Sequence, residues 1–163
     1  MSVDETRPIG VTRMDDSEIR SFVSHRNVGV LGLPDTDTPY VIPMSYDFDG
    51  EDNLYFTFVL GEDSHKEDLS DRADQGSFLV YDATSAFIWE SVAMTGEIGE
   101  LSSEERAEVA DSLGNAWRPD AFKNTDPSWE TTLYRFRIRE TVGLEGTGLP
   151  AGLEDDPGGD SSR

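Results

Sequence analysis

Residues 55–69 read Y-F-T-F-V-L-G-E-D-S-H-K-E-D-L, and this stretch decides how the chain folds. Its aromatic and β-branched residues predict a strand that breaks at Gly61. A helix start follows, because Ser64 can cap the first turn and Glu67 can complete a capping box. We therefore expect a strand, a tight loop and a helix N-terminus in direct succession.

Lys66 gives this helix start a second interpretation. A cation in a first helical turn opposes the helix dipole, and only two lysines occur in the chain, Lys66 and Lys123. A phosphate would remove the conflict, because the free backbone amides and the side chains of Ser64, His65 and Lys66 could converge on it. Gly61 would let the loop turn closely around that group. The capping box and the phosphate site are both compatible with the spacing, and Lys66 favours the phosphate site.

Composition indicates one acidic domain. The 163 residues are enough to bury one core, and no apolar run approaches the roughly 20 residues that cross a bilayer. The first residues lack an apolar signal region, so we expect a cytoplasmic protein without a membrane partner. A net charge of −21 argues against nucleic acid as a partner. With no cysteine and only two histidines, His25 and His65, no metal site is expected.

The acidic excess also indicates adaptation to salt. Self-repulsion of this size destabilises a compact chain, but at about 1 M salt the Debye length falls to about 3 Å and screens it. In this respect the sequence resembles the proteins of salt-loving archaea. The alternative is an acidic disordered protein, against which the aromatic-rich, alternating segments argue.

The remaining segments predict a barrel. Helices are expected at residues 15–25 and 64–72 and from Ser102 or Ser103 to about Gly114, and strands at residues 27–33, 39–48, 53–59, 76–82, 87–101 and 131–143. Pro43 suggests a bulge, an edge or a bound ligand, whereas Asp47 and Asp49 read as turn residues. This order predicts a mainly β (α+β) fold, a six-stranded antiparallel barrel with flanking helices. We expect the domain to span residues 14–145, between a flexible N-terminal segment (1–13) and a disordered acidic tail (146–163).

Four motifs on these elements resemble a known family, the pyridoxamine 5'-phosphate oxidase-like FMN-binding split barrels. They are P-Y-V-I-P-M-S-Y-D-F (39–48), L-Y-F-T-F (54–58), G-E-D-S-H-K-E-D-L (61–69) and W-E-S-V-A-M-T-G-E (89–97). The resemblance covers roughly residues 14–144 and points to the nitroimidazole-resistance type of flavoprotein. Each motif alone is weak, but the four occur in register on a matching strand order.

The resemblance implies that FMN lies at a homodimer interface. Thr57, Ser64 and Lys66 would hold its phosphate, with His65 beside them. Two segments would flank the isoalloxazine ring, and their residues are Pro43, Met44, Ser45, Tyr46, Trp89, Glu90, Ser91 and Val92. Met44 and Tyr46 could equally belong to the barrel core, and Trp89 could equally pack an interface.

Two departures from the family pattern limit what the resemblance implies. The oxidase proper carries an Arg and a Lys on the second strand, where this chain has Ser45 and Tyr46. Its C-terminal strand carries an arginine and a histidine for pyridoxal phosphate, whereas residues 135–137 read R-F-R. These departures argue against oxidation of pyridoxamine phosphate.

The sequence therefore indicates an FMN-dependent oxidoreductase with an unidentified small-molecule substrate, in which the flavin carries the chemistry. One alternative is a binding module that holds FMN or haem without turnover, with His65 as the axial ligand. Another is a deazaflavin-dependent reductase on the same fold. A homodimer is expected on independent grounds, because a single subunit would have difficulty covering Trp89, Trp117 and Phe122.

Overall fold

The computed structural model describes residues 10–60, 65–110 and 130–148. In chain order its elements are β1 (Val11–Arg13), α1 (Asp16–Ser24), β2 (Val28–Leu33), β3 (Tyr40–Ser45), β4 (Asp47–Phe48), β5 (Asn53–Leu60), α2 (His65–Arg72), β6 (Gln75–Ala83), β7 (Ile88–Glu100), α3 (Ser103–Ala110) and β8 (Glu130–Thr147). Trp117, Phe122 and most of the expected acidic tail lie outside the described residues.

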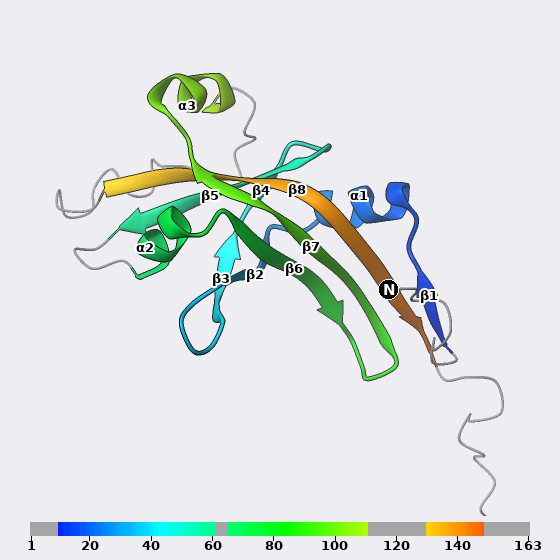
Figure 1. The fold of residues 1–163 in the computed structure, drawn as a ribbon. Helices are drawn as coiled ribbons and strands as arrows, with labels where there is room; N and C mark the ends of the chain where they lie inside the picture. Colours follow the sequence, from blue (N-terminus) through cyan, green and yellow to red (C-terminus); the bar gives the residue numbers. More distant parts are fainter. Residues whose placement is uncertain (1–9, 61–64, 111–129, 149–163) are drawn as a thin grey trace, which may run out of the picture.

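All strands belong to one antiparallel sheet. Its order is β3-β2-β6-β7-β8-β5-β4, and β1 pairs with β8 beside this path. The long strands β6, β7 and β8 curve together, so that the sheet forms a half-barrel with α1, α2 and α3 around it (Figure 1). The predicted antiparallel split barrel is confirmed, but not with six strands. The expected strand 39–48 is divided into β3 and β4, and β1 is additional.

The division between β3 and β4 creates the split in the barrel. β3 pairs with β2 at one end of the strand order, whereas β4 pairs with β5 at the other end. Only Tyr46 separates the two strands, so the segment 40–48 lies at both edges of the sheet and joins them. Towards its N-terminus this segment leaves β5, because Asp47 is the first residue of the segment that is paired with β5.

Alternation along the strands separates a core face from an outer face. Phe56, Phe78, Tyr134 and Phe136 are fully buried on the core face, where the three phenylalanine rings pack against one another. Helix α1 covers this core with Ile19, Phe22 and Val23. The α1 N-cap is Asp15, and its carboxylate forms a capping box with Glu18.

Glycines at two positions allow close approach. A Cβ on Gly143 of β8 would lie 2.6 Å from Cγ1 of Ile19, so only glycine lets α1 pack this closely on the sheet. The β7–β8 pairing shifts register between Thr95 and Gly96, and a Cβ on Gly96 would collide with the backbone of Arg137. The strand therefore has a bulge at this glycine.

A second, smaller cluster lies on the outer face. It contains Tyr55, Leu101 and Leu133, and Val109 of α3 packs against it. Helix α3 therefore covers one end of the outer face, over β5 and the start of β8. The rest of the outer face, formed by β3, β2, β6, β7 and the C-terminal half of β8, has no helix on it among the described residues.

The ends of the domain extend further than expected. Val11–Arg13 form β1, which pairs with residues 144–146, so these residues are part of the sheet rather than flexible. Residues 146 and 147, assigned to the tail, still belong to β8. No helix in the described ranges has the length and apolar character that a membrane span requires.

Candidate functional site

The split between β3 and β5 brings together several residues that the sequence singled out. Asp47 of β4 faces Tyr55 of β5 in register, and Phe48 faces Leu54. Residues 56–60 of β5 pair only with β8, and β3 pairs only with β2. The facing edges of β3 and β5 therefore have no partner strand within the described ranges, and their backbone groups are available to a ligand.

Strand alternation sets which side chains face the outside of this split. Met44, Tyr46 and Phe56 point into the core, so Ser45, Asp47 and Thr57 point outward. Ser45 and Thr57 are half-buried. They are the first outward residues beyond the Asp47–Tyr55 register on β3 and β5, so their hydroxyls flank the opening of the split.

Pro43 lies on the free edge of the sheet. It faces Val30 of β2, and its side chain is exposed on the outer face. Of the three sequence-based interpretations of this proline, the edge position is what the structure shows. A proline has no N–H, so this edge offers one donor fewer to any neighbour.

Helix α2 follows β5 and reaches back to β3. His65, its first residue, lies with Nε2 3.0 Å from Oδ2 of Asp35, and its ring meets the Tyr40 ring edge-on at 5.1 Å. The backbone N–H of Thr36 donates to Asp35 and, with the contact from His65, lowers the pKa of that carboxyl. The start of α2 is thus tied to the β2–β3 loop on the far side of the split.

The predicted phosphate residues are only partly described. Thr57 is placed at the split, and the backbone of Lys66 lies in the first turn of α2. Ser64 lies outside the described residues, as do the side chains of Lys66 and Glu67. The choice between a capping box and a phosphate site therefore stays a prediction from the sequence.

Met44 and Tyr46 occupy the core, which was one of the two interpretations of each. Tyr46 is 4% exposed, its phenol donates to the Val23 carbonyl at 2.7 Å, and its ring packs edge-on against Phe78. Burial raises the pKa of Tyr46 above its ordinary value. Neither side chain reaches the outer face, and the backbone N–H of Tyr46 donates to the Asn27 carbonyl at 2.9 Å.

The second predicted segment lies on β7 and divides between the two faces. Trp89 and Ser91 point outward, whereas Val92 is fully buried in the core. The indole of Trp89 lies across Gly146 of β8, where a Cβ would come within 2.7 Å of its Nε1. Because β2 and β6 lie between them, β3 and β7 are about 14 Å apart at the usual strand spacing, and Ser91 is displaced by two further residues from the register of Pro43.

An apolar row crosses the outer face between these two segments. Its five residues face one another in successive registers, and they are Pro43, Val30, Leu79, Ala93 and Val142. Val28 and Tyr81 on the same face are more than half exposed, and Leu79 is 37% exposed. An apolar surface that spans five strands is typical of a surface that a partner or ligand covers.

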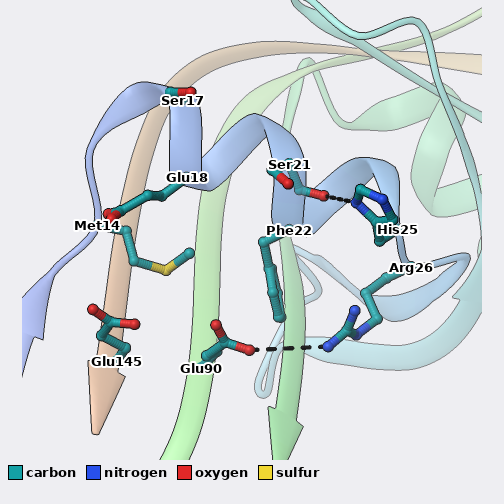
Figure 2. Close-up of a pocket in the computed structure, with 9 residues that line it drawn as sticks. All are labelled: Met14, Ser17, Glu18, Ser21, Phe22, His25, Arg26, Glu90 and Glu145. Carbon is teal, nitrogen blue, oxygen red and sulfur yellow. Dashed lines mark hydrogen bonds and ion pairs between the residues drawn. The ribbon is translucent and has the colours of Figure 1, made fainter. Parts of the chain in front are cut away.

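Glu90 points to a different place, a hollow of about 520 Å³ between α1 and the ends of β7 and β8. Figure 2 shows Phe22, Arg26, Glu90 and Glu145 around it. Arg26 lies over the Phe22 ring and approaches Glu90 at 3.9 Å, while it also bonds Asp82 at 2.8 Å. The sequence did not reveal this arrangement, because it depends on the Asp82–Glu90–Glu145 register across three strands.

Asp47 and Asp49 also differ from the sequence interpretation. Asp49 is a turn residue, since its carboxylate accepts from the backbone of Glu51 and from the backbone and side chain of Asn53. Asp47 is not, because it belongs to β4. It is half-buried and has no hydrogen-bond or ion-pair partner in the described part of the chain, and burial raises its pKa. The sequence does contain a signal for the outward position of Asp47, namely the strict alternation of side chains from Pro43 to Asp49.

The sequence model of the pyridoxamine 5'-phosphate oxidase family matches residues 15–144, and a search of curated proteins finds no match. Among solved structures, a FAD-binding protein from Mesorhizobium loti aligns with a TM-score of 0.61 at 18% identity, over 85% of this chain and 98% of its own. A candidate 5-nitroimidazole antibiotic resistance protein from Bacteroides thetaiotaomicron aligns with a TM-score of 0.63 at 18% identity, over 85% of this chain and 89% of its own. A heme binding protein from Mycobacterium smegmatis aligns with a TM-score of 0.62 at 13% identity, over 80% of this chain and 53% of its own. At these identities the likeness shows the fold.

Proposed function

The chain belongs to the pyridoxamine 5'-phosphate oxidase family, and from this premise we propose that it is a flavoprotein that binds FMN at the split and acts as an oxidoreductase on a small molecule. The observation that carries the proposal is the split itself. It presents two unpaired strand edges and the outward hydroxyls of Ser45 and Thr57, next to an apolar outer face. A flavin needs the same combination, an apolar surface for its ring and polar groups for its ring edge, ribityl chain and phosphate.

The residues of the split would bind and orient the cofactor, and bound FMN would supply the hydride or electron transfer. The backbone of Pro43 and Ser45, at the free edge of β3, would contact the polar edge of the ring. Thr57 and the first turn of α2 with Lys66 would hold the phosphate, where the positive end of the helix dipole adds to the attraction. No protein acid or base is assigned.

A homodimer would complete the site. Trp89 and Ser91 lie more than about 14 Å from Pro43 within one subunit, so we assign them to the flavin held by the other subunit. The apolar row from Pro43 to Val142 would then be buried between the two copies. A twofold axis gives this arrangement two equivalent sites, each built from both subunits.

Haem is the less favourable occupant. His65, the proposed axial ligand, is exposed, and its Nε2 is engaged by Asp35 at 3.0 Å. If His65 bound iron through Nε2, this contact would break and the Asp35 carboxylate would lose its imidazole partner. A deazaflavin would fit the same split, because it carries a similar tricyclic ring and ribityl chain.

We further propose that the protein works in concentrated salt. If every one of the 13 cationic side chains paired with an acid, 34 − 13 = 21 carboxylates would still be uncompensated. Arg26, Arg72, Arg135 and Arg139 already form ion pairs at the surface, and such exposed pairs contribute little stability.

Reduction of the bound flavin tests the oxidoreductase function. FMN-loaded protein in molar KCl would be mixed anaerobically with NADH or NADPH, and the flavin absorbance recorded. We expect bleaching with one donor and recovery when a quinone or a nitro compound is added. Flavin that stays oxidised with both donors would favour the binding module instead.

A further inference from the structure

Asp47 occupies a position that the fold alone does not explain. It lies in β4, opposite Tyr55, in the last register before β3 and β5 diverge. Partial burial removes some of the water around this carboxylate and raises its pKa, and no donor in the described ranges replaces that water. Within the described residues no backbone N–H, hydroxyl or cation reaches it, although the neighbouring Asp49 receives three hydrogen bonds.

The position of Asp47 relative to the proposed cofactor contacts follows from the register. Ser45 and Thr57 are each two residues away from the Asp47–Tyr55 pair, on β3 and β5 respectively, and all four side chains point outward. Two residues along a strand span about 7 Å. Asp47 therefore lies at the closed end of the split, between the strand assigned to the ring and the strand assigned to the phosphate.

We infer that Asp47 accepts hydrogen bonds from the ribityl hydroxyls of the bound flavin and thereby positions the chain between its ring and its phosphate. This inference rests on the proposed function. An ionised carboxylate only accepts hydrogen bonds, and neighbouring hydroxyls on a flexible chain are suitable donors. A carboxylate repels phosphate, so Asp47 does not contact that end of FMN.

The burial of Asp47 is consistent with this role. Desolvation raises its pKa, which is the condition expected of a group whose charged form is stabilised only when a ligand donates to it. Arg135, which lies beyond β5 on β8, is engaged by Glu105 at 3.1 Å and does not compensate Asp47.

The test compares three flavins that differ in one part each. FMN carries ring, ribityl chain and phosphate, riboflavin lacks the phosphate, and lumiflavin lacks the whole chain. Their dissociation constants would be measured by fluorescence in molar KCl for the wild type, Asp47→Ala, Asp47→Asn and the control Asp49→Asn. Asp49→Asn removes the same charge from the same hairpin, on a residue already assigned to the turn.

We expect Asp47→Ala to weaken FMN and riboflavin by about tenfold to a hundredfold, the range of a hydrogen bond to a charged group. Lumiflavin should be unaffected, and Asp47→Asn should show a smaller loss because its amide oxygen still accepts. Asp49→Asn should bind all three flavins as the wild type does. Folding should not limit the test, since Asp47→Ala removes an unfavourable buried charge.

Two results would overturn the inference and leave the flavoprotein function intact. One is equal affinity of wild type and Asp47→Ala for riboflavin. The other is an equal loss for riboflavin and lumiflavin, which would place Asp47 at the ring or in the fold. Failure of the wild type to bind any of the three flavins would contradict the proposed function itself.

Discussion

The phenol of Tyr46 donates a hydrogen bond of 2.7 Å to the backbone carbonyl of Val23, near the end of α1. Tyr46 separates β3 from β4, and its own N–H donates to the carbonyl of Asn27. This one residue therefore fixes the point where the chain changes its partner strand, and it joins that point to the helix that covers the core.

We predict that Tyr46→Phe lowers the free energy of unfolding by about 1 kcal/mol, the net value of a buried hydrogen bond, and leaves FMN affinity unchanged. Tyr81→Phe is the control, because Tyr81 is 58% exposed. Denaturant unfolding and FMN titration in molar KCl would measure both quantities. A clear loss of FMN affinity in Tyr46→Phe would contradict this prediction and would show that the phenol contacts the cofactor.

A dimer held by the outer face should be sensitive to charge in the apolar row. Leu79→Glu would place a carboxylate from each subunit in the buried interface, so we expect a monomer at micromolar concentration. Ile88→Glu is the control, since Ile88 is 54% exposed but points to the opposite face of β7. Light scattering in molar KCl would measure the oligomeric state of the wild type and of both variants. If both variants are dimers, or if the wild type is a monomer, the outer face is not the dimer interface.

Asp47 and Asp49 should respond to pH with opposite signs. Burial raises the pKa of Asp47, so its ionisation in the folded state costs stability, and Asp47→Asn should raise the unfolding free energy at pH 7 but not near pH 3. Burial also acts on Asp49, but the hydrogen bonds from Asn53 and Glu51 outweigh it and lower that pKa. Asp49→Asn should therefore lower stability at pH 7, and this loss should fade as the pH falls through the lowered pKa. Urea unfolding at both pH values would show the signs, and two changes of equal sign at pH 7 would contradict the assignment.

Salt should stabilise the fold. Because acidic side chains outnumber basic ones by 21, raising KCl from low to molar concentration screens their repulsion and should raise the thermal midpoint. Differential scanning fluorimetry over a KCl series would measure this trend. A flat or falling midpoint would count against adaptation to salt.

The sequence predicted the individual helices and strands more accurately than the pairing of strands that closes the barrel. Hydrophobic alternation in residues 131–143 placed Tyr134 and Phe136 in the core, and Asp15 with Glu18 placed the start of α1, because these signals are local. The break at Tyr46 was not predicted, because alternation continues unchanged through it while the partner strand changes. The Arg26–Asp82 contact and the outer apolar row also depend on pairing between distant strands, so no local sequence pattern could predict them.

The residues that the sequence named for the site divide between the two faces of the sheet. Ser45, Thr57 and His65 lie around one split, whereas the side chains of Met44, Tyr46 and Val92 are in the core. Sequence reasoning named contiguous runs such as residues 43–46, but a strand presents only alternate side chains to one face. Asp47, two residues after Ser45, belongs to the same outward set, but its place just before the D-G-E-D turn at residues 49–52 led to its interpretation as a turn residue.

Substitution of Lys66 distinguishes the two interpretations of the α2 N-terminus, a phosphate site and a capping box. If Lys66 holds the FMN phosphate, Lys66→Ala should weaken FMN by about tenfold to a hundredfold and leave riboflavin almost unchanged. If Ser64 and Glu67 only form a capping box, the same change removes an unfavourable dipole contact and leaves both affinities as they were. Fluorescence titration of both flavins into apo wild type and Lys66→Ala gives the answer, and equal FMN affinities would assign α2 to capping.

The measurement that bears most directly on flavin binding at the split is the visible spectrum of the protein after incubation with FMN in molar KCl and removal of free flavin by gel filtration. We predict that one flavin per subunit is retained and that its oxidised bands are shifted from those of free FMN. A protein that elutes without flavin, or that is purified with a Soret band and does not exchange it for FMN, would contradict the assignment.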